Sequence, residues 1–399
     1  MNKMHNFLAK LLDGKAVEWK TLGEVVAIAN NARKPVKASL RESGDIPYYG
    51  ANNIQDYVSG YTHDGEFVLI AEDGSADLKN YSIQFVKGKF WANNHVHVVS
   101  GNNEILNNRF LFHYLTQLNF MPYLSGSGRA KLTKAKLIEI PIPIPPLSVQ
   151  QEIVRILDAL TALTSELTSE LALRKKQYQY YREKLLSFDS ICQSIGRGGI
   201  AKPINVVWRT LGEIAEKISS GGTPSTANKS FYENGNIPWL RTQEVNFGEI
   251  TETEIKITDE AVKQSSAKWI SENCVIIAMY GATVGRVAIN KIPLTTNQAC
   301  ANIQVNPEIA NYRYVFHYLM MKYEFIKSLG KGSQTNINIG IVKNLVIPIP
   351  PLTEQQRITN ILDKFEQLTH SITDGLPRLI ELNQKRYEYY REMLLSFER

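Results

Sequence analysis

The chain carries the same series of motifs twice, in the same order. VEWKTLGEV returns as VVWRTLGEI 189 residues later, IPIPPLSVQQEIVRILD returns as IPIPPLTEQQRITNILD 205 residues later, and YYREKLLSF returns as YYREMLLSF 209 residues later. A long internal period constrains the architecture before any local element is assigned. We therefore expect two halves built from the same parts. The motifs begin at Val17, Ile142 and Tyr180 in the first half and at Val206, Ile347 and Tyr389 in the second.

The stretch between the first and second motifs differs most between the halves. It is 16 residues longer in the second half (205 minus 189), whereas the stretch from the second motif to the third is four residues longer (209 minus 205). In the divergent stretches, FVLIAED, HVHVV and CVIIAMYG predict strands, while RFLFHYLTQL and RYVFHYLMMKY predict short helices. Each stretch is therefore expected to form a mixed α/β domain, and two such domains are a normal number for 399 residues.

A long helix is predicted after each proline-rich motif. Proline lacks an amide donor and disfavours helical geometry in the residue before it, so the prolines mark extended entries. Ser148 with Gln151, and Thr353 with Gln356, fit the capping box that opens a helix. In the second helix, Gly375-Leu376-Pro377 should introduce a kink or an interruption.

Apolar residues recur along both predicted helices at alternating steps of three and four, the pattern of a coiled-coil seam. An ordinary core or a homodimerising coiled coil would explain one such seam. Two matched seams in one chain favour an antiparallel pair related by a pseudo-two-fold axis. The predicted helix-pair interface comprises Ile153, Ile156, Leu160, Leu163, Leu167 and Leu171 in the first helix and Ile358, Ile361, Phe365, Leu368 and Ile372 in the second. The expected fold class is thus α/β (α+β), with two mixed domains separated by two long antiparallel helices.

Composition sets broad limits on the class of protein. Lys and Arg number 45 against 39 acidic residues, a net charge of +6 that suits a polyanionic partner but describes only nonspecific attraction. The three cysteines have no CxxC spacing, so neither a disulfide framework nor a cysteine zinc site is proposed. Without an apolar run long enough to span a bilayer or to serve as a signal peptide, the expected location is the cytoplasm.

Catalytic motifs are missing from the sequence. There is no GxxxxGK[ST] phosphate loop, no Asn-Pro-Pro-aromatic or Asp-Pro-Pro-aromatic methyltransfer motif, and no Pro-Asp pair that would begin a nuclease carboxylate cluster. GATVGR, from Gly281 to Arg286, matches no nucleotide fingerprint. His95 and His97 lie two apart, but no third ligand is suggested, so a structural or DNA-facing role is favoured over a metal site. No catalytic residue and no metal ligand is predicted.

Loops rich in aromatic, amide and basic residues occupy matched places in both halves. Asn and Gln can pair with adenine edges and Arg or Lys with guanine, while glycine lets backbone amides approach phosphate. Any one loop could equally be a solvated turn, so the recurrence carries the argument. The predicted DNA-facing residues are Tyr48, Tyr49, Asn52, Asn53, Arg129 and Lys131 in the first half, and Arg241, Gln243, Lys331, Gln334 and Asn336 in the second.

The repeated IPIPPL followed by QQ, the two YYRE tails and the TLGE element after a tryptophan resemble the specificity (S) subunit of type I restriction-modification systems over essentially the whole chain. TSELTSEL, from Thr164 to Leu171, followed by RKKQYQYYR, is similar to the IC branch of that family. The resemblance implies two target-recognition domains that each read one half of a split DNA sequence. It also implies helices that act as a ruler for the unread spacer, which two TSEL copies would set at about six base pairs.

The same resemblance implies partners and a division of the chain. Two methyltransferase (M) subunits would bind, and two restriction/motor (R) subunits would join the full complex. S-adenosylmethionine, ATP and Mg would be used by these partners, with no cofactor in this chain and no membrane contact. The implied parts are target-recognition domain 1 (1–146), conserved spacer helix 1 (147–188), a linker (189–205), target-recognition domain 2 (206–351) and conserved spacer helix 2 (352–399).

Two other functions remain open from the residues alone. A free-standing sequence-specific DNA-binding regulator would use the same two domains without a methyltransferase. A single-chain restriction enzyme would need the catalytic motifs that the sequence lacks.

Overall fold

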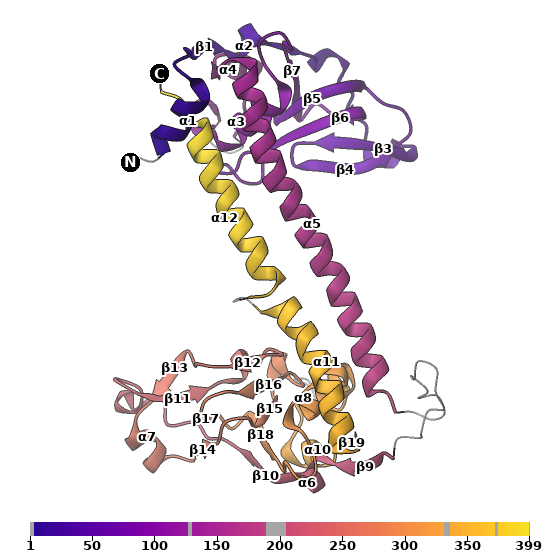
Figure 1. Ribbon diagram of the computed structural model, residues 1–399, viewed down its shortest axis with the longest axis vertical. Helices are drawn as coiled ribbons and strands as arrows, with labels where there is room; N and C mark the ends of the chain where they lie inside the picture. Colours follow the sequence, from indigo (N-terminus) through magenta and orange to yellow (C-terminus); the bar gives the residue numbers. More distant parts are fainter. Residues whose placement is uncertain (1–3, 127–129, 189–204, 331–335, 372–373, 399) are drawn as a thin grey trace. The chain divides into compact units, whose positions relative to one another are not determined.

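The computed structural model (Figure 1) describes residues 4–126, 130–188, 205–330, 336–371 and 374–398. The chain forms two compact units. The first combines Met1–Ser169 with Arg378–Arg399, and the second is Glu170–Pro377. Helix α5 (Leu147–Leu186) contributes residues to both units. We describe each unit separately.

A six-stranded sheet forms the centre of the first unit, in the order β2-β7-β5-β6-β3-β4, with antiparallel neighbours except for β3 and β6. The run FVLIA in β5 is apolar throughout because both faces of the strand are buried. Val68 and Ile70 pack with Phe110 of helix α3, and Leu69 packs in a smaller core on the other face. The sheet strands are β2 (Val26–Ile28), β3 (Ser43–Gly50), β4 (Asn53–Val58), β5 (His63–Ala71), β6 (Ile83–Ala92) and β7 (Val96–Gly101).

In place of the six-stranded sheet, the second unit has a five-stranded sheet and a four-stranded sheet. Their orders are β10-β18-β15-β16-β12 and β13-β11-β17-β14. β15 is again buried on both faces: Val275 and Ile277 pack in the core that contains helix α8, and Ile276 packs in another core. The strands are β10 (Ala215–Ser220), β11 (Ile237–Leu240), β12 (Glu249–Ile250), β13 (Ile255–Ile257), β14 (Trp269–Ile270), β15 (Val275–Ala278), β16 (Val287–Asn290), β17 (Leu294–Thr296) and β18 (Cys300–Val305).

Helices complete both units, and the two predicted short helices are confirmed as α3 and α8. The first unit contains α1 (Met4–Leu12), α2 (Leu22–Val25), α3 (Asn108–Gln117), α4 (Lys134–Ile138) and most of α12 (Leu376–Leu395). The first two residues of α12, Leu376 and Pro377, belong to the second unit. The second unit contains α6 (Leu211–Ile214), α7 (Asp259–Gln264), α8 (Tyr312–Met321), α9 (Tyr323–Ser328), α10 (Ile339–Lys343) and α11 (Leu352–His370). No helix in the described ranges combines the length and the apolar character needed to cross a membrane.

The first two repeated motifs pair with each other in each unit. β1 (Glu18–Thr21) is antiparallel to β8 (Pro141–Ile144), and β9 (Val207–Thr210) is antiparallel to β19 (Val346–Ile349). The TLGE segment after each tryptophan then forms a short helix with a capping box, Thr21 with Glu24 and Thr210 with Glu213. The motifs therefore recur together because they form one strand pair in each half.

The capping boxes predicted at Ser148 and Thr353 are wrong. α5 begins one residue earlier, at Leu147, where Pro146 O accepts the first helical amides, and α11 begins after Pro351, which supplies no side-chain cap. The first glutamine of each QQ pair instead makes the same polar contact in both units. Gln150 Oε1 accepts from Asn107 N, and Gln355 Oε1 accepts from Asn311 N, both at 2.8 Å. Each glutamine thus joins the long helix to the residue that caps α3 or α8.

The predicted interruption near Gly375 is confirmed, because α11 ends at His370 and α12 begins at Leu376. In each unit a part of α5 lies antiparallel to one of these helices. In the first, Asn383 of α12 donates to Leu160 O at 2.7 Å. In the second, the rings of Tyr178 and Tyr181 stack on Phe365 of α11.

The predicted interface residues fall into three groups by exposure. Ile153 and Ile358 are fully buried, and Leu163 and Leu368 are exposed. Ile372 lies outside the described residues. The remaining residues are partly buried, namely Ile156, Leu160, Leu167, Leu171, Ile361 and Phe365.

Candidate nucleic-acid interface

A loop of the same construction follows a central strand in each unit. β5 ends at Ala71 and β15 ends at Ala278, and both are followed by two residues and a glycine, in IAEDG and IAMYG. Gly74 has φ 74° and Gly281 has φ 72°, a left-handed conformation that favours glycine. We call residues 72–76 and 279–283 the strand-end loops.

Each strand-end loop is bonded to a segment that the sequence predicted to face DNA. Leu132 N donates to Glu72 O at 2.7 Å, and Ile337 N donates to Met279 O at 2.9 Å. Leu132 and Ile337 lie 205 residues apart, the offset of the second repeated motif. The structure therefore builds the same pair of adjacent loops in both units from divergent sequences.

In the first unit, two predicted DNA-facing residues contact one strand-end loop. The Asn52 side chain donates to Gly74 O at 2.7 Å and accepts from Ala76 N at 2.8 Å. Lys131 forms a β-bridge with Asp73, and its Nζ lies 3.1 Å from Glu72 Oε1. Both side chains belong to exposed residues. Asn52 thus fixes the loop, while Lys131 places a cation beside it.

The Glu72 carboxylate lies between two cations. Arg33 Nη1 approaches it to 2.7 Å and Lys131 Nζ to 3.1 Å. Burial raises the pKa of Glu72, but hydrogen bonds from Arg33 and Lys131 outweigh burial and hold that pKa below its usual value. Glu72 is therefore ionised at neutral pH, and the three groups together carry one net positive charge. Lys131 is the more exposed of the two cations, so it is the one that an anion such as a phosphate can reach.

The two histidines near this loop have separate structural partners. His97 is buried, with Nε2 2.7 Å from Leu132 O and Nδ1 3.0 Å from Asn30 Nδ2. His95 Nδ1 lies 2.6 Å from Asp73 Oδ1. Among the described residues, the one group with the spacing of a metal site lies elsewhere and contains neither histidine.

The aromatic residues of the predicted set differ in position. Tyr48 is only 1 % exposed, and Arg41 lies over its ring at 4.1 Å, so its ring is not available to a duplex. The pattern IPYYG did not reveal which of its two tyrosines points inward. Tyr49 is partly buried against Phe90, and burial raises its pKa. Asn53 is exposed, with φ 94°.

In the second unit the predicted residues lie on two elements. Arg241, at the end of β11, pairs with Glu254 at 2.5 Å, and Gln243 nearby is exposed. Asn336 Oδ1 accepts from Gly281 N at 3.2 Å and so fixes the strand-end loop, as Asn52 does in the first unit. Arg129, Lys331 and Gln334 lie outside the described residues.

Sequence reasoning missed the strand-end loops themselves. Tyr280 is 40 % exposed beside Gly281, and Arg286 Nη1 donates to Asn246 at 3.2 Å. GATVGR matched no nucleotide fingerprint and was therefore given no role. The signal that would have found these residues is the recurrence of Ile-Ala-x-x-Gly 207 residues apart.

The fold and these loops define a class of protein that presents two polar surfaces of like construction from two α/β domains. The family model described as "Type I restriction modification DNA specificity domain" matches residues 15–173 and 203–382. A Haemophilus influenzae protein named as a type I restriction enzyme specificity subunit is 52 % identical over the full length of both chains. The EcoR124I/EcoR124II specificity subunit of Escherichia coli is 38 % identical over 98 % of this chain and 97 % of its own.

This chain belongs to the specificity subunits of type I restriction-modification systems. It is therefore a non-catalytic subunit that selects DNA for such a system. Solved structures show the same fold: the S subunit of M. genitalium aligns with a TM-score of 0.66 at 14 % identity over 97 % of this chain and 98 % of its own. The HsdS subunit of Thermoanaerobacter tengcongensis aligns with a TM-score of 0.50 at 18 % identity over 96 % of this chain and 97 % of its own.

Proposed function

We propose that each unit reads one half of a split DNA target through the surface around its strand-end loop. The observation that supports this proposal is the repeated loop pair, Glu72 with Leu132 and Met279 with Ile337. The backbone bonding is the same in both units, while the side chains differ. A common frame with different side chains is what two half-sites of different sequence require, since base edges are distinguished by side-chain donors and acceptors.

Within this surface we assign some residues to phosphates, some to base edges and some to support of the loop. Lys131, next to an ionised and doubly paired Glu72, suits a phosphate. Gln243 is exposed and suits an adenine edge, which takes two hydrogen bonds from one amide group. Asn52 and Asn336 act on the loop backbone, so we assign them a supporting role. Tyr49, Asn53 and Arg241 remain proposed contacts.

The helices are proposed to set the spacer between the half-sites. TSELTSEL, residues 164–171, lies inside the continuous helix α5. Each four-residue copy adds about 6 Å of helix, to be compared with about 3.4 Å per base-pair step. We keep the division into recognition domains 1–146 and 206–351, helices 147–188 and 352–399, and linker 189–205, with a spacer of about six base pairs.

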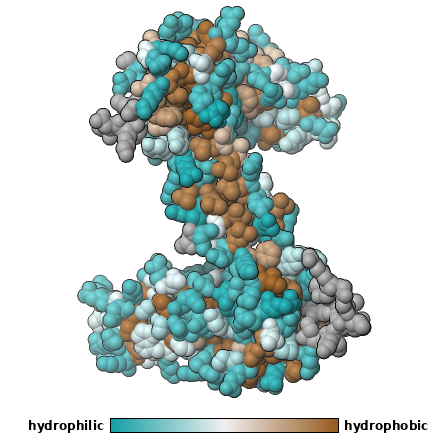
Figure 2. Space-filling model, in the orientation of Figure 1, coloured by the Kyte–Doolittle hydropathy of each residue, from teal (hydrophilic) through white to brown (hydrophobic). Residues whose placement is uncertain are grey.

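The same helices are proposed to bind two methyltransferase subunits, to which two restriction subunits are added in the cytoplasmic complex. Leucines on the helices of the first unit stay exposed, at 40 % for Leu163, 48 % for Leu379 and 38 % for Leu382. Figure 2 shows hydrophobic residues gathered along these helices. An apolar stripe of this kind suits a partner helix. S-adenosylmethionine, ATP and Mg would be used by those partners.

Mapping of modified adenines tests the proposal. In cells that express this chain with its methyltransferase, we expect methylation at one split motif with two defined halves. A chain that binds DNA tightly alone, and directs no methylation with any methyltransferase, would instead favour the free-standing regulator.

A third TSEL copy inserted after Leu171 should lengthen the preferred spacer, by at most about two base pairs from the helix and duplex rises. Both half-sites should stay the same, since neither loop surface changes. The matched control replaces the second TSEL with AAEL, which alters the sequence at constant length and should leave the spacer unchanged. An unaltered motif after the insertion would contradict the ruler.

Single substitutions test the assignment of contacts. Gln243→Ala should relax one position of one half-site, by about 1–3 kcal/mol of discrimination, and leave the other half-site intact. Lys131→Ala should weaken binding to all sequences and lower the salt slope by about one. Uniform weakening by both variants would remove Gln243 from the base contacts.

A further inference from the structure

One buried histidine lies where three helices meet in each unit. His113 is on α3 and His317 is on α8, in the matched runs RFLFH and RYVFH. Both side chains are fully buried. A buried histidine without partners is costly, so each ring nitrogen should have one.

The first partner is an aspartate on the helix that follows the domain. His113 Nε2 lies 2.7 Å from Asp158 Oδ1 on α5, and His317 Nε2 lies 2.7 Å from Asp363 Oδ1 on α11. Asp158 and Asp363 are the same residue of the repeated ILD motif. Burial raises the pKa of each carboxyl, but the histidine hydrogen bond and a neighbouring arginine outweigh burial and lower that pKa, so each carboxylate is ionised.

The second partner is a tyrosine on the other helix of the pair. His113 Nδ1 lies 3.4 Å from the Tyr387 hydroxyl of α12, and His317 Nδ1 lies 3.2 Å from the Tyr178 hydroxyl of α5. An ionised carboxylate only accepts, so the proton lies on Nε2 and leaves Nδ1 as acceptor for the tyrosine hydroxyl. Burial lowers the pKa of both histidines, consistent with neutral rings.

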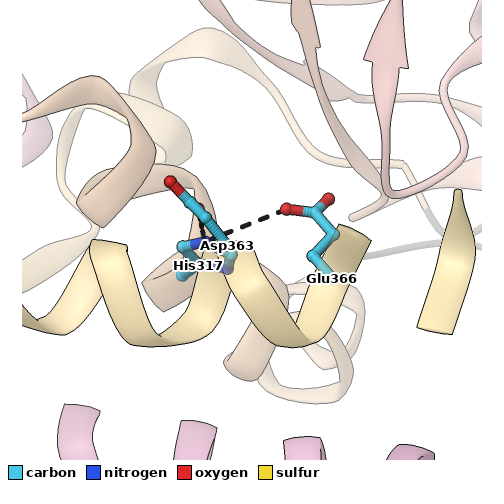
Figure 3. Close-up of side chains that lie close together, drawn as sticks. All are labelled: His317, Asp363 and Glu366. Atoms are coloured by element: carbon cyan, nitrogen blue, oxygen red, sulfur yellow. Dashed lines mark hydrogen bonds and ion pairs between the residues drawn. The ribbon is translucent and has the colours of Figure 1, made fainter. Parts of the chain in front are cut away.

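The second unit adds Glu366 to this arrangement, 4.0 Å from His317 Nε2 (Figure 3). His317, Asp363 and Glu366 have the spacing of a metal site. Arg313 already supplies the cation, with Nε 2.8 Å from Asp363 Oδ1 and Nη2 2.7 Å from Glu366 Oε2. The first unit has Arg109 on Asp158 in the same way. The residues common to both units are therefore the aspartate, histidine, tyrosine and arginine. Because Glu366 has no counterpart in the first unit, metal binding does not explain the shared arrangement.

We propose that the residues of the two Asp–His–Tyr triads are positioning residues, which fix the angle between each recognition domain and its two helices. A fixed angle in turn limits which spacer lengths the subunit accepts. Each triad joins one domain helix to both helices of the pair at a single rigid ring. The hydrogen bonds of a buried polar network are directional, and apolar contacts of similar volume can replace them at little cost in stability, so we assign the triads to orientation rather than to stability. This proposal rests on the proposed reading of a split target.

Removal of the tyrosine hydroxyls tests the triads. The assembled methyltransferase complex is offered duplexes with the wild-type spacer or with one base pair more or fewer, and the variants are Tyr178→Phe, Tyr387→Phe and both together. We expect each single variant to raise methylation of the altered spacers, relative to the wild-type spacer, about fivefold, the factor that corresponds to one net hydrogen bond, and the double variant to raise it further. Tyr180→Phe and Tyr389→Phe are matched controls, since these tyrosines are exposed on the same helices.

The ratio separates positioning from structural support. If the triads only stabilise the fold, the variants should lower the melting temperature and the methylation of all spacers. The ratio of methylation on altered spacers to methylation on the wild-type spacer would then stay unchanged. His113→Gln keeps a donor toward Asp158 and loses the acceptor for Tyr387, so it should change the ratio as Tyr387→Phe does, with no further change when both are combined.

Two outcomes refute different claims. If the wild-type complex methylates a split target and the double variant keeps the wild-type ratio within twofold, the triads do not position the domains. If the wild-type complex methylates no split target, the proposed function fails before the triads are tested.

Discussion

The charged groups around His113 in the first unit differ from those around His317 in the second. In the first, Arg109 pairs with Asp158, whose side chain is 37 % exposed. In the second, Arg313 contacts Asp363, Glu366 and Glu249. The Glu366 side chain is 13 % exposed, and the place 205 residues earlier holds Thr161. Burial, reinforced by Asp363 and Glu249, raises the pKa of Glu366 to about 7 despite the attraction of Arg313.

This difference shows that the domain-to-helix junction is conserved in geometry rather than in charge. Aspartate, histidine and tyrosine keep the same partners in both units. The second unit carries two further acids around one guanidinium. A buried charge that loses its only counterion is far more costly than a half-exposed one. The second unit should therefore depend on its arginine much more than the first does.

Replacement of each arginine by methionine should give the largest difference in stability between the two units. Arg313→Met leaves Glu366 and Asp363 without their cation and should destabilise the second unit by about 3–5 kcal/mol at pH 8. Arg109→Met should cost the first unit about 1 kcal/mol, because water reaches Asp158. Hydrogen exchange of β5 and β15 peptides in increasing urea measures each unit separately. Equal losses in the two units would contradict the difference.

Glu366→Gln tests the additional acid by its pH dependence. The folded-state pKa is raised above the unfolded value near 4.5, so wild-type stability falls as pH rises from about 4.5 to 7 and stays low above that. The variant should lack this fall and gain stability at pH 8, by an upper estimate on the order of 3 kcal/mol. Exchange of β15 peptides at pH 5.5 and pH 8 measures the effect.

The first unit is the internal control for this prediction, since Thr161 does not titrate and the β5 peptides should respond to pH as in the wild type. The other titrating groups are shared by variant and wild type, so they cancel in the difference. An unchanged pH profile in the β15 peptides would show that Arg313 fully stabilises the Glu366 charge.

The sequence predicted the organisation because repeats and proline constraints do not depend on tertiary contacts. The recurrence of the motifs, the helices α3 and α8, and the break before Leu376 all follow from the sequence without tertiary contacts, whereas the pairing of the motifs as strands was not predicted. The helix starts were mispredicted because Pro146 and Pro351 open the helices with their backbone. Gln150 and Gln355, each one residue before the glutamine of a predicted capping box, make long-range bonds that no local rule identifies.

The candidate interface was less predictable, because side-chain direction depends on neighbours distant in sequence. Tyr48 and Tyr49 are adjacent aromatics, yet one lies in the core. Asn52 stays a predicted DNA-facing residue, and the sequence did not show that its side chain also holds the loop at Gly74. The histidine triads combine residues up to 274 positions apart, so no spacing rule could have assembled them.

The smallest expected effect concerns how each unit holds its helix pair. Asn383 of α12 is buried and donates to Leu160 O at 2.7 Å and to Thr164 Oγ1 at 2.8 Å. The matching residue of the other repeat, Arg174, makes an ion pair with Glu170 of its own helix at 2.7 Å. The first unit thus has a polar bond across its helices at a position where the second has a contact within one helix.

Alanine at these two positions should therefore give unequal losses. Asn383→Ala should cost about 1 kcal/mol, since two cross-helix bonds are lost while the Asn383 Oδ1 atom, buried without a partner, is also removed. Arg174→Ala should cost at most about 0.5 kcal/mol, the value of an exposed pair one turn apart. Urea midpoints of the two variants test the order. If Arg174→Ala had the larger effect, its side chain would have to stabilise the helix pair of the second unit through contacts beyond Glu170.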